Sequence, residues 1–182
     1  MSQYEIATRS APLPDVLPSV SYDVDFRGIP QNFDLDLHYL ADYLRGRGLD
    51  DEQIEGVGVE FSARVSLENL DTTAGLKGRY MTESHRCVVF LSNIGIMVAN
   101  AAKELDKSPD WAVKMTHGIV ADTLAHELEH YVSHAERGFT DDEEEYTNWR
   151  PDGDNTAYFE QPEEVRARAA EGQFDPSRLL LS

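Results

Sequence analysis

The sequence contains a single cysteine, Cys87, and few basic residues. One cysteine excludes an intramolecular disulfide, and its place in the apolar run 87–91 favours a buried, unreactive thiol over a nucleophile or a metal ligand. Sixteen Lys and Arg residues stand against 34 Asp and Glu residues, which gives a formal net charge of −18. Because such a surface repels phosphate backbones, we expect no nucleic-acid partner. The acidity favours solubility, and a partner or substrate with a basic surface is the alternative.

Long hydrophobic stretches are also missing from the chain. No apolar run approaches the roughly 18 residues that a membrane-spanning helix needs. The segment Met1–Val20 lacks the basic start and the apolar stretch of a secretory signal. These patterns predict a soluble, cytoplasmic protein without a membrane partner.

The length of 182 residues fits one domain with a sizeable core. Three prolines near the start predict a flexible N-terminal arm over residues 1–18, so the domain is expected to span 19–182. Alternating or apolar runs predict strands, and helical spacing predicts helices. The predicted strands are 19–26, 56–67 and 86–91; the predicted helices are one capped by Asn32 or Asp34, 93–105, 108–138 and 162–171.

The longest of these helices has the clearest boundaries. Ser108 is a typical N-cap, Pro109 fits the first turn, and Gly138 is a suitable C-terminal stop. The segment 139–157, which holds five consecutive acidic residues, predicts a mobile loop. The apolar end of the chain, Leu179–Leu181, is expected either to dock on the core or to fray.

An H-E-x-x-H motif, His126-Glu127-Leu128-Glu129-His130, lies in the later half of that long helix. In a helix the two histidines stand about one turn apart and lean the same way, so both imidazoles can bind one Zn²⁺. Glu127 is placed to take a proton from a zinc-bound water. A chance motif on an ordinary amphipathic helix is the alternative.

A catalytic zinc site usually has a third protein ligand. His134 lies a further turn along, and three histidines in a straight file cannot converge on one tetrahedral ion, so we expect His134 to be a solvated surface residue. Carboxylates downstream remain, namely Glu160, Glu163 and Glu164. Glu163 and Glu164 belong to the helix predicted over residues 162–171. In that helix Val165, Ala167 and Ala169 are expected to provide small apolar contacts.

The motif followed by Glu163-Glu164-Val165-Arg166-Ala167-Arg168-Ala169 resembles the gluzincin zinc peptidases, and most closely the small single-domain minigluzincins of the ImmA/IrrE type. The resemblance covers roughly residues 86–172. It implies an α+β, zincin-like fold, with a small mixed or antiparallel sheet packed on a long active-site helix and further helices.

The same resemblance implies that His126, His130 and Glu164 bind the metal and that Glu127 is the general base. Glu163 is the alternative third ligand. Many gluzincins carry an acidic residue just after the ligand glutamate, which orients a histidine. Here the nearby positions hold arginines, so that carboxylate must come from elsewhere. The candidates are Glu160, Glu163, Glu171 and Asp122.

Two further features concern the substrate. Tyr158 and Tyr131 are candidates to donate a hydrogen bond to a developing oxyanion, although a tyrosine in such a position is more often a core or rim aromatic. In zincins of this shape a strand before the motif helix forms the lip of the cleft and pairs with extended substrates. The strand predicted over residues 86–91 is the best candidate, and an interior position fits its composition equally well.

The sequence therefore predicts a zinc-dependent peptidase that acts on a peptide or protein. The alternative is a non-enzymatic, zincin-like module that binds a protein partner through its acidic face. An intact Glu127 favours the enzyme, because a structural zinc site has no need of a base and usually has four protein ligands.

Overall fold

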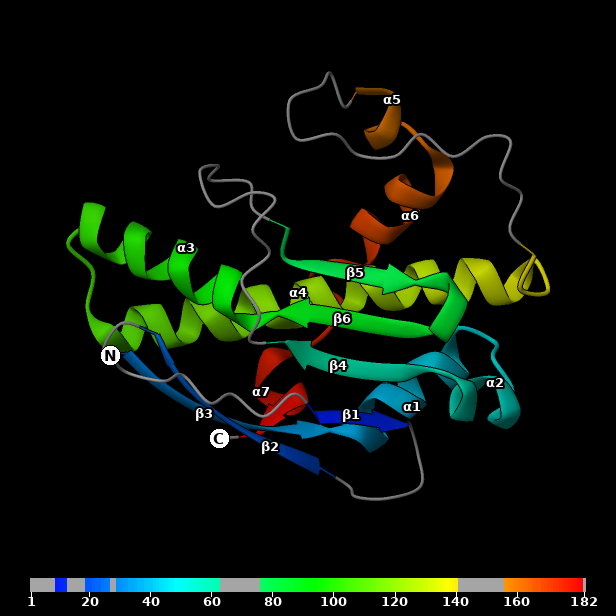
Figure 1. The fold of residues 1–182 in the computed structure, drawn as a ribbon, viewed down its shortest axis with the longest axis horizontal. Coiled ribbons are helices and arrows are strands. Elements are labelled where there is room, and N and C mark those ends of the chain that lie inside the picture. The colour runs from blue at the N-terminus through cyan, green and yellow to red at the C-terminus, as the bar shows by residue number, and fades with distance from the viewer. Residues whose placement is uncertain (1–8, 13–18, 27–28, 63–75, 141–155, 182) are drawn as a thin grey trace.

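The computed structural model describes residues 9–12, 19–26, 29–62, 76–140 and 156–181. These residues form an α+β fold in which a small mixed sheet packs against a long helix, as the sequence predicted (Figure 1). The segment 141–155, which holds most of the predicted acidic loop, lies outside the described residues.

The main sheet has the strand order β1-β4-β6-β5. Its neighbours β4 and β6 run parallel, and the other two pairs are antiparallel. Both predicted strands in this part of the chain are present, as β4 and β6, whereas β5 was not predicted. The strand bounds are β1 Arg9–Pro12, β4 Gly58–Ser62, β5 Gly78–Met81 and β6 Arg86–Phe90.

A second, antiparallel sheet is formed by β2 (Ser19–Phe26), β3 (Ile29–Asp36) and β7 (Leu180–Leu181). The pairing of β7 with β3 fixes the C-terminal leucines, so this end of the chain docks on the fold. Leu179, which directly precedes β7, is fully buried.

Helices cover the main sheet and close the core. The central one is α4, which runs behind β5 and β6, while α6 crosses it near the β5 edge (Figure 1). The helix bounds are α1 Leu37–Gly46, α2 Asp51–Gly56, the short 3₁₀ turn Thr82–Ser84, α3 Leu91–Glu104, α4 Pro109–Glu136, α5 Thr156–Phe159, α6 Pro162–Ala170 and α7 Pro176–Leu179.

The predicted boundaries of α4 are confirmed. The Ser108 hydroxyl accepts a hydrogen bond from the Trp111 N–H at 3.2 Å, which satisfies one of the free N–H groups of the first turn. Gly138, just beyond the helix, takes the left-handed conformation with φ 68°. Val120, Leu124 and Leu128 are fully buried, so α4 is anchored along its length in the core.

Two details differ from the sequence prediction. The cap of α1 is Asp36, whose side chain accepts from the Tyr39 N–H, because residues 29–36 are taken up by β3 rather than by an earlier helix start. Within the predicted N-terminal arm, Arg9–Pro12 pairs with β4. Its place at the sheet edge explains why a proline is tolerated there.

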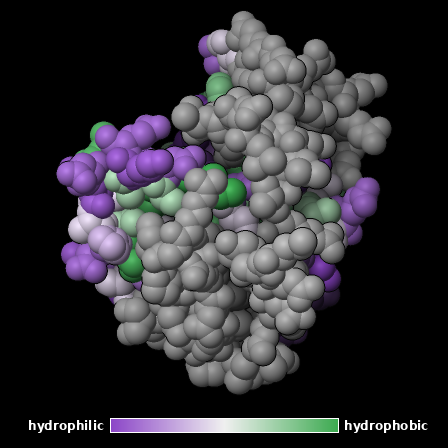
Figure 2. Space-filling model, turned by 60° about the vertical axis from the view of Figure 1, so that its left-hand side comes forward, coloured by the Kyte–Doolittle hydropathy of each residue, from purple (hydrophilic) through white to green (hydrophobic). Residues whose placement is uncertain are grey.

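The described surface is mixed in character. On the face drawn in Figure 2, hydrophilic residues lie beside hydrophobic ones. Among the described residues, no helix has both the length and the apolar character that a membrane span requires.

Candidate metal centre

The two motif histidines lie side by side on one face of α4. Their Nε2 atoms are 3.2 Å apart, and their side chains are 16% and 10% exposed for His126 and His130. The one-turn spacing in the sequence produces this arrangement directly. The site is therefore held on a rigid helix and is still open to solvent on one side.

Glu164 reaches the same point from α6. Its two carboxylate oxygens lie 3.5 Å from His126 Nε2 and 3.2 Å from His130 Nε2. Donor atoms at about 2.1 Å from a tetrahedral zinc ion are separated by about 3.4 Å. The separation of the two Nε2 atoms and the distance from each of them to one Glu164 oxygen are close to that value, and one donor atom from each residue lies within 4.8 Å of the others, so the three residues could hold one metal ion.

The two glutamates proposed as third ligand have different surroundings. Glu164 is buried beside the histidines, whereas the Glu163 carboxylate forms an ion pair with Arg137. The geometry thus favours Glu164 as the ligand, and the group that can hold a metal does not include Glu163.

Electrostatics couple the three ligand candidates. Burial raises the pKa of Glu164, but hydrogen bonds from His126, His130 and Tyr158 outweigh burial and hold that pKa well below its usual range. Burial lowers the pKa of His126. The hydrogen bond to Glu164 and the negative charges of Glu127 and Glu164 raise it by more than burial lowers it, so the pKa of His126 is raised overall. The carboxylate is thus kept ionised, as a metal ligand must be.

Glu171, just after α6, orients the first histidine. Its Oε1 atom lies 3.0 Å from His126 Nδ1, which leaves Nε2 directed at the metal position. The other three candidates for this role are engaged elsewhere or exposed. Asp122 accepts from the Gly172 N–H at 2.9 Å, Glu163 pairs with an arginine, and Glu160 is exposed.

Glu127 points toward β5 and is only 7% exposed. Burial raises its pKa, which the nearby histidines and a hydrogen bond from the Tyr80 N–H partly offset. A carboxylate with a raised pKa accepts protons more readily near neutral pH. Gly78 allows β5 to lie this close, since a Cβ there would stand 2.8 Å from Glu127 Oε1 and 2.5 Å from Thr123 Cγ2.

Behind Glu127 lies a cluster that the sequence did not indicate. The Tyr80 hydroxyl lies 2.8 Å from His134 Nδ1 and 3.1 Å from His85 Nδ1. The expectation of a solvated His134 is therefore wrong, because this residue is 3% exposed. Its position on α4 turns it toward β5, a strand that was missing from the prediction.

The two tyrosines considered as oxyanion donors lie in different places. Tyr158 hydrogen-bonds the Glu164 side chain, so its hydroxyl is next to the metal position. Tyr131 is fully buried and donates to the Gln53 carbonyl, away from the site. Only Tyr158 remains a candidate.

The strand that lies against Glu127 is β5. The predicted lip, β6, lies between β4 and β5 and is an interior strand, as its apolar composition also allowed. Within the described part of the chain, β5 is an edge strand of this sheet. Its Arg79 and Met81 side chains are exposed.

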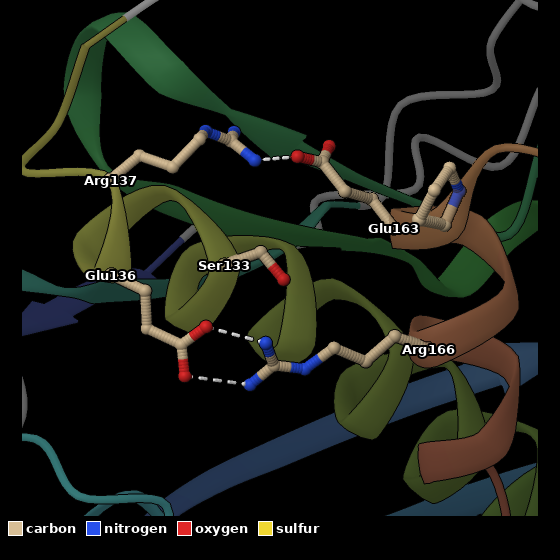
Figure 3. A pocket seen from close by; sticks show the side chains of 6 residues that line it. Ser133, Glu136, Arg137, Glu163 and Arg166 are labelled. Atoms are coloured by element: carbon tan, nitrogen blue, oxygen red, sulfur yellow. Dashed lines mark hydrogen bonds and ion pairs between the residues drawn. The ribbon is translucent and has the colours of Figure 1, made fainter.

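A charged cavity of about 200 Å³ lies between α4 and α6, beyond His130. Figure 3 shows Arg137 and Glu163 pointing toward each other across it, and Glu136 pointing toward Arg166. The two ion pairs join the helices on either side of Ser133.

Comparison of the chain with protein-family models, with curated proteins and with solved structures finds no match. The functional argument therefore rests on the residues and their geometry.

Proposed function

We propose that this protein is a zinc-dependent peptidase that hydrolyses a peptide bond in a peptide or protein substrate. The convergence of His126, His130 and Glu164 at tetrahedral donor spacing is the observation that carries the proposal. Glu127, with its raised pKa beside these residues, supports an enzyme over a site that serves structure alone.

Each residue has a role in the proposed reaction. His126, His130 and Glu164 would hold the zinc ion, which when bound would lower the pKa of a coordinated water to about 7 and polarise the substrate carbonyl. Glu127 accepts the proton of the attacking water and delivers it to the leaving amine. Glu171 keeps His126 in orientation. Tyr158, whose side chain hydrogen-bonds Glu164, is the proposed donor to the developing oxyanion.

The substrate is proposed to bind as an extended chain along β5. Within the described part of the chain β5 is an edge strand, and an extended peptide can add to such an edge as a further strand. The Tyr80 N–H of the same strand is bound to Glu127, so a peptide on this edge lies next to the proposed base.

Metal content is the first test. The full chain, purified without added metal and then dialysed against zinc, is expected to hold about one zinc per chain, and His126→Ala to lose it. Absence of zinc from the unmodified chain, with His126→Ala changing nothing, would contradict the proposal.

Hydrolysis is the second test. A peptide library from a digested proteome, with new termini read by mass spectrometry, serves as the substrate. Glu127→Gln should keep the zinc and lower the rate about 10²–10⁴-fold, because it removes the base. Glu160→Gln, a change at an exposed glutamate, is the matched control. Zinc bound without any cleavage would favour the interaction module.

A further inference from the structure

The second glutamate of the motif, Glu129, is the centre of a buried polar network. Its side chain is fully buried, and both oxygens have partners. Oε1 accepts from the Tyr43 hydroxyl at 2.7 Å, and Oε2 accepts from Arg47 Nη2 at 2.6 Å and from Arg166 Nε at 3.0 Å. A buried carboxylate with this many charged donors holds its neighbours in a defined geometry.

Arg166 connects this network to the helix that carries Glu164. Its Nη atoms bind the two oxygens of Glu136 at 2.5 and 3.0 Å, while its Nε binds Glu129. Both glutamates belong to α4, two turns apart on one flank. Arg166 of α6 therefore binds α4 through three hydrogen bonds, and Figure 3 shows the two that reach Glu136.

The apolar contact of α6 with the rest of the fold is made by small side chains. Ala167 and Ala170 are buried, while Val165 is 55% exposed and Ala169 is also exposed, contrary to the expected contacts. Alanine methyl groups allow close approach but interlock weakly with a facing helix. Polar contacts must therefore determine how α6 is turned about its axis.

Arg166 and Glu164 lie on opposite flanks of that alanine contact. At about 100° per residue, the two side chains are about 200° apart on α6, and Ala167 and Ala170 fall in the arc between them. Turning α6 so that Arg166 leaves Glu129 would also move Glu164 relative to the histidines. The contact of Arg166 with Glu129 on one flank of α6 therefore affects the position of Glu164 on the other flank.

We propose that Glu129 and Arg166 are positioning residues of the zinc site, which hold α6 in the rotation that brings Glu164 to His126 and His130. The inference rests on the proposed metal site and adds to it a role for the arginine that stands two residues after the ligand. It also gives a function to Glu129, which faces away from the metal position.

The test is a double-mutant cycle on zinc affinity with the full chain. The dissociation constant is measured by competition with a chromophoric chelator for Arg166→Met, Glu164→Ala and the double variant. Arg166→Met is expected to weaken zinc binding about 10–100-fold. In the Glu164→Ala background the same change should matter less than about threefold, because Arg166 acts through Glu164.

Three controls accompany the cycle. Arg168→Met removes the same charge from α6, but this exposed arginine stacks on Phe159 at 4.0 Å and should leave zinc affinity unchanged. Arg166→Lys should restore only part of the affinity, since it cannot bind both glutamates in a fork. The visible spectrum of bound Co²⁺ should change for Arg166→Met and not for Arg168→Met, because coordination geometry sets it.

The outcomes separate this inference from the proposed function. The positioning role is overturned if Arg166→Met lowers zinc affinity equally in the unmodified chain and in the Glu164→Ala chain, or if it causes no loss in the unmodified chain. In either case the metal site itself stands. An unmodified chain that binds no zinc overturns both. If Arg166→Met does not fold, Glu136→Gln replaces it in the cycle, because this change weakens the ion pair with Arg166 at a half-exposed residue. The expected loss of zinc affinity is then up to about fivefold.

Discussion

Three glutamates of α4 and α6 lie in three different environments. Glu164 lies among imidazole and hydroxyl donors and has a lowered pKa. Glu127 is buried against β5, where burial raises its pKa despite the nearby histidines. Glu129 is paired with two arginines. One residue type is thus proposed for three roles, those of ligand, base and anchor, and the surroundings distinguish the three glutamates.

At the residue scale, Glu171→Ala is expected to weaken zinc binding about 10–100-fold, because His126 loses the partner of its Nδ1 atom. The side chain of Glu171 is 44% exposed, so the free energy of unfolding of the metal-free chain should change by less than about 0.5 kcal/mol. Chelator competition and urea denaturation measure the two quantities. Glu160→Ala is the control, and equal zinc affinity in all three proteins would exclude the orienting role.

At the element scale, the helical repeat of α4 directs its side chains toward different neighbouring elements. His126 and His130 face α6, Glu127 and His134 face β5, and Glu129 faces the arginines of α1 and α6. The site depends on β5 lying close to α4 as much as on the helix itself. Gly78 is the residue that permits this close approach.

Gly78→Ala is therefore expected to lower the free energy of unfolding by about 1–3 kcal/mol, since its Cβ would overlap Thr123 and Glu127. Gly118→Ala, in the middle of α4 with open space around it, should instead raise that free energy by up to about 1 kcal/mol. Urea denaturation of both variants measures the contrast. Destabilisation by Gly118→Ala, or none by Gly78→Ala, would contradict this view of the α4–β5 contact.

At the scale of the whole molecule, the site joins β5, α4 and α6, which are far apart in the sequence. A ligand that bridges such elements stabilises the folded state, because the unfolded chain cannot offer the same site. Zinc at 100 times its dissociation constant contributes about 2.7 kcal/mol. For a chain of this size that corresponds to an increase in Tm of roughly 5–10 °C.

The zinc-induced increase in Tm is expected to grow between about pH 6 and pH 8. The pKa of His126 is raised in the folded chain, so its proton stabilises the metal-free protein below the ordinary histidine pKa, and this contribution is lost as the pH rises through the raised value. Zinc needs the deprotonated imidazole, so its own contribution appears over the same range. Thermal melts with zinc and with a chelator measure the difference.

Two histidine variants provide the controls for this titration. His126→Ala should abolish the zinc effect at every pH. His38→Ala, a change at an exposed histidine, should leave it intact. A zinc effect that is independent of pH in the unmodified chain would contradict the coupling.

The sequence by itself determined the features that depend on local order. The cap at Ser108, the long apolar face of α4 and the four-residue spacing of His126 and His130 are local, so helix geometry places these histidines together in any fold that keeps the helix. The strands at residues 19–26 and 86–90 were likewise readable from alternation or apolar runs.

The tertiary structure decided what depends on contacts between distant segments. Glu164 and Glu163 are adjacent in sequence, and only the packing of α6 on α4 directs the first to the histidines and the second to Arg137. Similarly, β5 is too short and too polar to be recognised from its pattern, so the burial of His134 beneath it could not be foreseen. The different surroundings of Glu127, Glu129 and Glu164 come from neighbours in other elements. The physical reason is that burial and nearby charge act through space and not along the chain.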